Sequence, residues 1–121
     1  MDEYRMYIDG KWVTSAQTMA VLNPATEEAI ATVPIASSEQ VQQALEAARR
    51  AQRDWARLTG VERGNFLRRW ADLVDRDHER LARLLSEEQG KPLAEARGEM
   101  SFGNSWFRYY AEFDRRIEGD I

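Results

Sequence analysis

The first third of the chain alternates short apolar runs with turn-forming residues. In MYIDGKWV, an Asp-Gly pair stands between two runs of β-forming residues, which is a strong signal for a β-hairpin. In VLNPATEEAIATVP, an Asn-Pro pair biases the chain away from helix, so the apolar runs at 19–22 and 29–34 are predicted to be strands joined by a turn. Residues 1–36 are therefore predicted to form a β-ribbon.

After residue 36 the apolar residues recur at helical spacing. Ser37 with Gln40 and Thr59 with Glu62 each have the spacing of a capping box, in which two side chains bond free backbone groups at the start of a helix. They predict one helix over about 38–56 and a second that begins after Thr59. The predicted buried stripes are Val41, Ala44, Leu45, Ala48 and Trp55 in the first helix, and Phe66, Leu67, Trp70, Ala71 and Val74 in the second.

The second helical stretch is long, and its pattern allows a break near Asp77. Gly90 is placed to cap its C-terminal end, and Pro92 suits the first turn of a last helix that ends before Gly119. Residues 37–121 are therefore predicted to be helical, with three to four helices. The buried stripe of the last helix is predicted to contain Leu93, Ala96, Met100, Gly103, Phe107 and Tyr110.

Composition narrows the class of protein. The chain has 121 residues, of which 43% are hydrophobic, enough for one domain or a piece of one. A net charge of -4 argues against a nucleic-acid or anionic-lipid partner. The absence of cysteine excludes disulfides, zinc-thiolate sites and a thiol nucleophile within these residues. No run approaches the roughly 18 apolar residues of a membrane span, so no membrane partner is expected and a cytoplasmic location follows by default.

The charged residues do not assemble into an evident active site. His78 is the one histidine and lies among charged neighbours, which predicts a solvated helix residue. The acids at 27–28 and 87–88 are adjacent in sequence, and adjacent side chains diverge on a helix. Paired arginines could bind a polyanion, but they stand among acids, and surface ion pairing is the simpler account. These arginine pairs are at 49–50, 68–69 and 115–116.

Gly98 and Gly103 fall inside the last predicted helix. Because they do not follow a strand, they do not form a glycine-rich phosphate loop. Each costs about 1 kcal/mol relative to alanine within a helix. Their presence implies either close packing at these positions or room for another group.

Five segments carry a resemblance that covers nearly the whole chain. They are YIDGKWV, VLNPATEEAIATVP, ALEAARRAQRDWARLTGVERGNFLRRWADLV, EEQGKPLAEARGEM and RYYAEFDRRIEGDI. In this order and spacing they resemble the N-terminal quarter of the NAD(P)-dependent aldehyde dehydrogenase superfamily, and the last segment is most similar to the lactaldehyde/glycolaldehyde type, with the succinate-semialdehyde type next. The resemblance implies an α/β fold in which residues 1–121 form the N-terminal part of a Rossmann-like cofactor domain, with the ribbon along its outside.

The resemblance also implies an activity. The full-length enzyme would oxidise an aldehyde to a carboxylic acid with NAD or NADP and form a homo-oligomer, a dimer or tetramer. The family's reactive thiolate, water-activating glutamate, oxyanion-holding amide and cofactor-binding lysine all come after residue 121. No catalytic or cofactor-binding residue is therefore expected here, and the chain alone is expected to be inactive and to bind no NAD(P). RRIEGDI stops where a chain would normally turn into its next strand, so the chain is expected to be cut.

Two candidate sites follow from the resemblance. Counting back from the Arg-Tyr-Tyr segment, Phe102 and Gly98 match positions that line the substrate tunnel, although Phe102 could equally be a core residue. In some members of the family, a monovalent cation is held by backbone carbonyls and a carboxylate that match Val21, Leu22 and Glu88. Such oxygen ligands suit a hard cation. A plain helix-end acid is the simpler account of Glu88.

Two alternatives compete with the enzyme fragment. One is a non-catalytic helical interaction or oligomerisation module that associates through its ribbon and apolar helix faces. The other is nucleic-acid binding through the paired arginines, which the acidic balance disfavours. A downstream reading frame with a cysteine-bearing catalytic segment would favour the enzyme, whereas an intact operon context that ends at codon 121 would favour the module.

Overall fold

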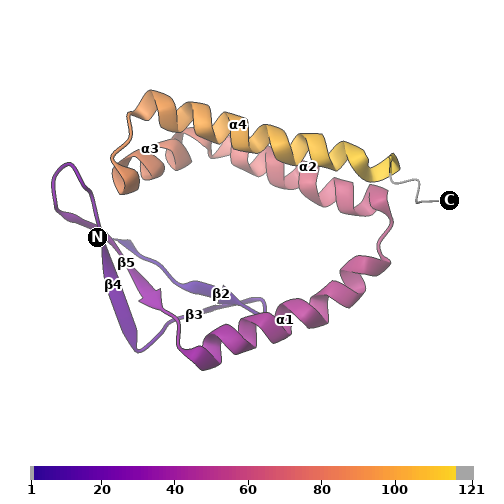
Figure 1. Cartoon of the computed structure of the whole chain (residues 1–121), viewed down its shortest axis with the longest axis horizontal. Coiled ribbons are helices and arrows are strands. Elements are labelled where there is room, and N and C mark those ends of the chain that lie inside the picture. The colour runs from indigo at the N-terminus through magenta and orange to yellow at the C-terminus, as the bar shows by residue number, and fades with distance from the viewer. Residues whose placement is uncertain (1, 117–121) are drawn as a thin grey trace. The chain divides into compact units, whose positions relative to one another are not determined.

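The computed structural model describes residues 2–116 and combines short strands with four α-helices (Figure 1). The chain divides into two compact units, each described by itself below. The first contains residues 1–54 and 87–90, and the second contains residues 55–86 and 91–121. The mixed α/β class and the number of helices predicted from the sequence are confirmed.

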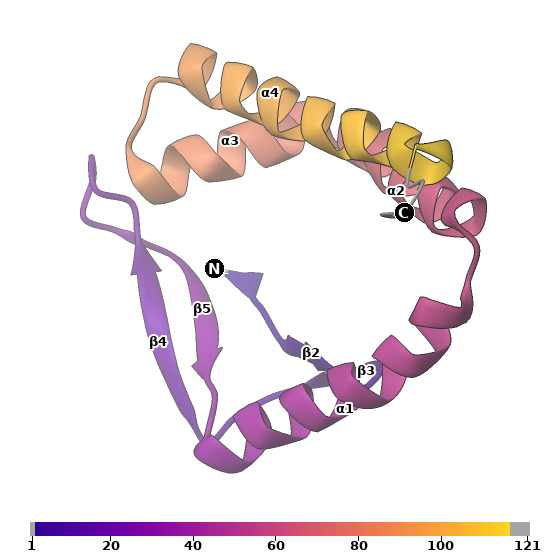
Figure 2. The same ribbon diagram turned by 45° about the vertical axis from the view of Figure 1, so that its right-hand side comes forward.

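The strands of the first unit form a three-stranded sheet and a separate hairpin. In the sheet, β5 lies between β4, to which it is antiparallel, and β1, to which it is parallel. The paired β4 and β5 are clearest in Figure 2. The two-residue β1 was not predicted, because so short a strand has no pattern of its own. The strands are β1 Asp2–Glu3, β2 Met6–Ile8, β3 Lys11–Val13, β4 Gln17–Leu22 and β5 Ala29–Ile35.

The predicted hairpin is confirmed, and its turn has the conformation that an Asp-Gly pair favours. Strands β2 and β3 pair antiparallel, with Tyr7 opposite Trp12. Asp9 has φ 52° and Gly10 has φ 77°, so both central residues are left-handed, as a two-residue type I′ turn requires. Tyr7 and Trp12 also contact each other through rings 5.1 Å apart, which supports the strand register.

Helix α1, Ser38–Arg57, begins with the predicted capping box. The Gln40 amide N–H donates to Ser37 Oγ at 3.2 Å, and the Ser37 amide N–H donates to Gln40 Oε1 at 3.0 Å. The predicted buried stripe is wrong, because Val41 and Leu45 are 49% and 52% exposed and the buried residue is Ala47. The hairpin lies over the alanine face of α1, and the bulkier stripe stays about half exposed.

The second unit is built from α2, Gly60–Arg76, and α4, Leu93–Ala111, with α3, His78–Gln89, between them in the chain. The Thr59 capping box is confirmed, with the Thr59 amide N–H donating to Glu62 Oε2 at 2.7 Å. The break near Asp77 is also confirmed, and Gly90 follows α3 with φ 75°. Both figures draw α2 and α4 side by side along their length.

Helix α4 ends at Ala111, before Gly119 as predicted, and a 3-10 turn, Glu112–Arg115, follows it. Arg68 of α2 donates to the Ala111 carbonyl at 3.1 Å and to Asp114 Oδ2 at 3.0 Å. A side chain far away in sequence therefore donates to the carbonyl of the last residue of α4. The predicted cap at Gly119 lies outside the described residues.

Helices α2 and α4 meet through small residues. A Cβ atom on Gly60 would lie 2.2 Å from the Asp114 carbonyl oxygen, and one on Gly64 would lie 2.8 Å from that of Ala111. The predicted burial of Ala71 and Ala96 is confirmed, but that of Phe66, Trp70, Phe107 and Tyr110 is wrong, because a close backbone approach leaves bulky flanking side chains outside. Among the described residues, the buried apolar side chains are all alanine: Ala31, Ala47, Ala71, Ala82, Ala96 and Ala111.

Candidate functional site

One face of α4 is open and aromatic, and it contains both residues matched to the substrate tunnel. Phe102 is 65% exposed. A Cβ atom on Gly98, one turn earlier, would meet no heavy atom within 4 Å among the described residues outside its own turn of helix. Close packing against the described residues therefore does not explain the glycine at position 98. The other explanation, room for another group, fits the open space beside it.

The aromatic face extends beyond Phe102. The Trp106 ring lies edge-on to the Phe102 ring, with centroids 5.8 Å apart and planes at 87°. Tyr109 and Tyr110 follow, each with its ring 6.0 Å from that of Trp106. Sequence reasoning missed Trp106, although its spacing of four residues from Phe102 was a signal that the two share a helix face.

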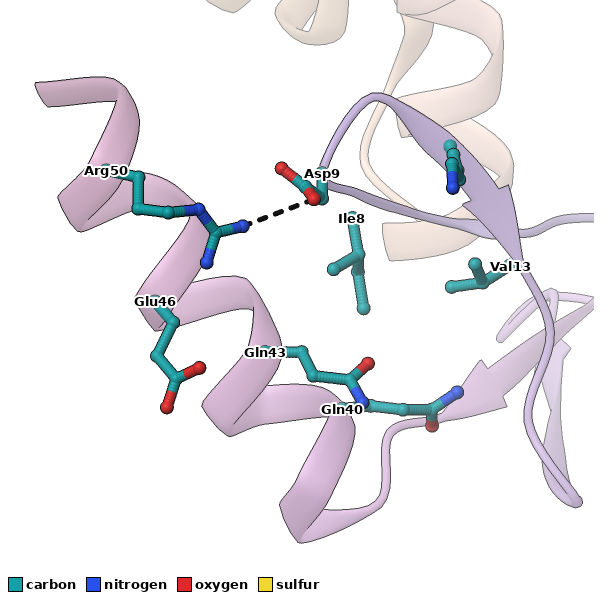
Figure 3. A pocket seen from close by; sticks show the side chains of 8 residues that line it. Ile8, Asp9, Val13, Gln40, Gln43, Glu46 and Arg50 are labelled. Atoms are coloured by element: carbon teal, nitrogen blue, oxygen red, sulfur yellow. Dashed lines mark ion pairs between the residues drawn. The ribbon is translucent and has the colours of Figure 1, made fainter.

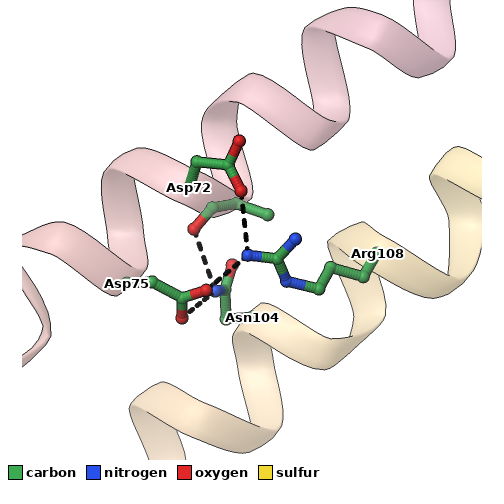
Figure 4. A network of polar contacts seen from close by, with 5 residues as sticks. Asp72, Asp75, Asn104 and Arg108 are labelled. Atoms are coloured by element: carbon green, nitrogen blue, oxygen red, sulfur yellow. Dashed lines mark hydrogen bonds and ion pairs between the residues drawn. The ribbon is translucent and has the colours of Figure 1, made fainter.

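A polar network fixes which side of α4 meets α2 (Figure 4). The Asn104 side chain is buried, at 4% exposure, and its Nδ2 donates to the Ala71 carbonyl at 3.0 Å and to Asp75 Oδ1 at 2.6 Å. Arg108 pairs with Asp72 at 3.0 Å and also with Asp75. The hydrogen bond from Arg108, followed by that from Asn104, lowers the pKa of the Asp75 carboxyl. These contacts hold α4 so that its open aromatic face points away from α2.

A second clamp joins α4 to α3. Arg97 donates from Nε and Nη2 to the two carboxylate oxygens of Glu79, at 2.8 and 2.7 Å. The hydrogen bond from Arg97, with the nearby charges of Arg97 and Arg83, lowers the pKa of Glu79 to about 2. Arg97 and Arg108 are the two cations of α4, and each is held by carboxylates of another helix.

His78 does not fit the predicted solvated position. Its side chain is half-buried, and Nε2 lies 3.1 Å from the Arg97 carbonyl oxygen and 3.0 Å from Ser101 Oγ. It therefore ties the start of α3 to α4. The Ser101 hydroxyl also lies 3.1 Å from the Arg97 carbonyl oxygen, to which it can donate.

The residues matched to a cation site come from two segments of the first unit. Val21 and Leu22 end β4, and a register shift between them interrupts the ladder with β5. Such a bulge leaves a residue outside the regular pairing. A Cβ atom on Gly90 would lie 2.7 Å from Pro24 Cγ, so the turn after β4 contacts the residue just past α3. Glu88, near the end of that helix, is exposed. Among the described residues, no cluster of three His, Cys, Asp or Glu side chains could hold a metal ion.

A cavity of about 260 Å³ lies between the hairpin and α1 (Figure 3). Its clearest polar contact is an ion pair between Arg50 and Asp9 at 3.2 Å, in which both side chains are more than half exposed. Exposed pairs of this kind contribute little to stability. Arg68 forms a second ion pair, with Asp114. Arg50 and Arg68, which belong to two of the arginine pairs noted in the sequence, are therefore both bound to carboxylates of this chain.

The described residues do not fit the pyrophosphate of a dinucleotide. Within residues 2–116, the one direct connection from a strand to a following helix is Ala36-Ser37, between β5 and α1, and it contains no glycine. A glycine-rich turn between a strand and a helix is what brings backbone amides close to a pyrophosphate. No described helix is long and apolar enough to cross a membrane.

Residues 12–121 match the aldehyde dehydrogenase family. The chain belongs to that family. Glutarate-semialdehyde dehydrogenase of Pseudomonas aeruginosa is 47% identical over 94% of this chain and 24% of its own length. The structure of Escherichia coli lactaldehyde dehydrogenase matches with a TM-score of 0.95 and 36% identity, over 99% of this chain and 26% of the other.

A third relative was solved with a cofactor. A point variant of Staphylococcus aureus betaine aldehyde dehydrogenase, in complex with NAD+, matches with a TM-score of 0.88 and 38% identity, over 92% of this chain and 23% of the other. Succinate-semialdehyde dehydrogenases are also among the matches, so both types named from the sequence are represented. The chain thus spans about a quarter of the length of these aldehyde dehydrogenases.

Proposed function

We propose that this chain is the N-terminal part of the cofactor domain of an enzyme that oxidises an aldehyde to a carboxylic acid with NAD or NADP. The observation that carries the proposal is the family match over residues 12–121. The full-length enzyme would work in the cytoplasm as a homo-oligomer, a dimer or tetramer. Bound NAD(P) would accept the hydride that leaves the aldehyde carbon.

The contribution of these residues would be to shape the substrate entrance. The exposed ring of Phe102 would form an apolar wall of the substrate entrance, and the missing side chain of Gly98 would leave space beside it for the substrate. The Asn104 and Arg108 contacts would keep this face of α4 turned toward the substrate. An aldehyde at such a wall would be held by shape and not by charge.

The 121-residue chain alone should produce no NADH or NADPH from any aldehyde. It contains no cysteine to attack the aldehyde carbon, and its described residues include no pyrophosphate loop. The full-length enzyme, assayed in parallel with acetaldehyde and each cofactor, should reduce one of them. Cofactor reduction by the chain alone, or none by the full-length enzyme, would refute the proposal.

The role of Phe102 can be tested in the full-length enzyme. Phe102→Ala should change kcat/KM for long and short aldehydes unequally, by about tenfold, because one lost apolar contact changes discrimination by about 10–200-fold. The matched control is Phe66→Ala, since Phe66 is a similarly exposed phenylalanine on α2. If both variants lower kcat/KM equally for every aldehyde, Phe102 has only a packing role.

We also propose a monovalent-cation site at the Val21 and Leu22 carbonyls and the Glu88 carboxylate. The contact between Pro24 and Gly90 supports it, because this contact brings the two segments together. In the full-length enzyme, Glu88→Ala should abolish the stabilisation by potassium, while Glu87→Ala should leave it intact. An unchanged potassium dependence in Glu88→Ala would remove the site.

A non-catalytic interaction module remains the second candidate, and the exposed apolar side chains favour it. It differs from the enzyme proposal in one result. A module would need no sequence after residue 121, so the chain alone would bind its partner as a monodisperse protein. The downstream coding sequence and the dispersity of the purified chain together separate the two candidates.

A further inference from the structure

The chain contains few side-chain amines. Of its 17 lysine and arginine side chains, two are lysines, Lys11 and Lys91, and the rest are arginines. A lysine amine can form a Schiff base with an aldehyde, whereas the arginine guanidinium stays charged and is a poor nucleophile. The proposed function exposes this chain to aldehydes, so the surroundings of the two lysines decide where such a reaction can occur.

Lys91 is held within the chain. Its side chain is 24% exposed, and its Nζ pairs with the Glu99 carboxylate on α4. The Lys91 carbonyl also accepts a hydrogen bond from Ser86 Oγ at 2.7 Å, which fixes the backbone just before α4. Burial and pairing together leave the Lys91 amine little access to a dissolved aldehyde.

Lys11 has different surroundings. It is exposed and lines the cavity of about 260 Å³ between the hairpin and α1, called the hairpin cavity below. Ile8 pairs with Lys11 across the hairpin, and Val13 lies two residues further along β3, so the three side chains share one face. Ile8 and Val13 are directed into the cavity from the hairpin (Figure 3). An apolar surface therefore lies next to the Lys11 side chain.

The carboxylates that line the hairpin cavity are bound to other groups. Asp9 pairs with Arg50 at 3.2 Å, and Glu46 accepts a hydrogen bond from Gln42 Nε2 at 2.9 Å. Neither of these two carboxylates is therefore committed to Lys11. The Lys11 amine is the more accessible of the two lysine amines, and it lies beside a cavity that can hold a small molecule.

We propose that Lys11 is a covalent modification site for aldehydes, with the apolar substituent of the aldehyde held in the hairpin cavity against Ile8 and Val13. The inference rests on the proposed function, which supplies the aldehyde. The Lys11 nitrogen bonds to the aldehyde carbon, the carbonyl oxygen leaves as water with two protons from the ammonium, and an iminium remains. The reaction consumes no oxidant or reductant, and water reverses it. The adduct therefore persists only while free aldehyde is present.

The test labels the full-length enzyme with butanal and sodium cyanoborohydride, which reduces the iminium to a stable secondary amine. NAD(P) is left out, so that the aldehyde is not consumed. Peptide mapping by mass spectrometry should find several-fold more adduct at Lys11 than at Lys91 in the folded enzyme, and equal adduct at both after unfolding in guanidinium chloride. Glu99→Gln should raise the adduct at Lys91, because it removes the carboxylate that holds the amine.

The role of the hairpin cavity is tested by the length of the aldehyde. Butanal should label Lys11 several-fold more than acetaldehyde does, because its alkyl chain contacts Ile8 and Val13. Val13→Thr keeps the size of the side chain but adds a hydroxyl, and it should reduce this preference. The matched control is Val41→Thr, since Val41 is exposed on α1 and does not line the cavity.

Two results would overturn the inference: equal labelling of Lys11 and Lys91 in the folded enzyme, or equal labelling of Lys11 by butanal and acetaldehyde. A full-length enzyme that reduces neither NAD nor NADP with any aldehyde would instead refute the proposed function. The two failures are distinguishable, because the labelling is measured without a cofactor.

Discussion

Two glycines of the paired helices α2 and α4 differ in the space around them, which is crowded at Gly64 and open at Gly98. At Gly64 a methyl group would lie 2.8 Å from the Ala111 carbonyl oxygen, whereas at Gly98 it would meet no described atom within 4 Å. Gly98→Ala should therefore raise the free energy of unfolding of the chain by up to about 1 kcal/mol, the usual helix preference for alanine. Gly64→Ala should lower it by about 1–3 kcal/mol through overpacking. Urea unfolding followed by helical circular dichroism measures both changes, and effects of the same sign would contradict this account.

The same residues show where sequence reasoning reached its limit. A glycine inside a predicted helix left two explanations open, close packing or room for another group. The choice between them depends on which side of α4 meets α2, and Asn104 and Arg108 set that side through partners 29 to 36 residues away in sequence. No local pattern contains that information. The tunnel roles of Gly98 and Phe102 came from family resemblance and remain predictions.

At the scale of secondary-structure elements, the predictions that depend on neighbouring residues are confirmed. Both capping boxes and the Asp-Gly hairpin involve side chains or backbone groups within a few residues, so the sequence contains everything that specifies them. Strand β1 depends on a distant partner, β5, and was not predicted. The predictions of buried residues on the helices were wrong for a related reason, because burial depends on which distant segment covers each face of a helix.

The start of α2 should be sensitive to its capping threonine. The Thr59 side chain accepts from the Glu62 amide N–H at 3.3 Å, and the Glu62 carboxylate accepts from the Thr59 amide N–H at 2.7 Å. Thr59→Ala removes the first of these bonds and should lower the free energy of unfolding by about 1 kcal/mol, while Thr59→Ser should preserve most of it. Equal losses in the two variants, measured by urea unfolding, would show that the hydroxyl is not acting as a cap.

The clamp between α3 and α4 should give a pH-dependent stability. The folded pKa of Glu79 is lowered to about 2 by Arg97, so the carboxylate stabilises the fold above the ordinary glutamate pKa of 4.5 and loses this contribution as the pH falls toward 2. The difference in unfolding free energy between the wild type and Glu79→Gln should therefore be full at pH 7 and shrink through that window. Glu95→Gln is the control, and a difference independent of pH would contradict the assignment.

At the scale of the whole molecule, residues 2–116 expose more large apolar side chains than they bury. No large side chain among the described residues is fully buried, while Phe66, Trp70, Phe102 and Trp106 are each about half exposed or more. Neighbouring exposed rings, such as those of Phe102 and Trp106, favour association. The purified 121-residue chain should therefore be marginally stable and form concentration-dependent oligomers, detectable by sedimentation velocity over a hundredfold range of concentration.

Charged substitutions at the exposed rings separate association from folding. Phe66→Glu and Trp106→Glu together should shift the chain toward monomer, because each removes an exposed apolar ring, without loss of helical circular dichroism. The same number of substitutions at exposed polar positions, Gln42→Glu and Gln52→Glu, should leave the association unchanged while adding the same charge. A sharp monomeric unfolding transition in the wild type, independent of concentration, would show that the exposed faces need no partner, which would favour a self-sufficient module over a part of a larger enzyme.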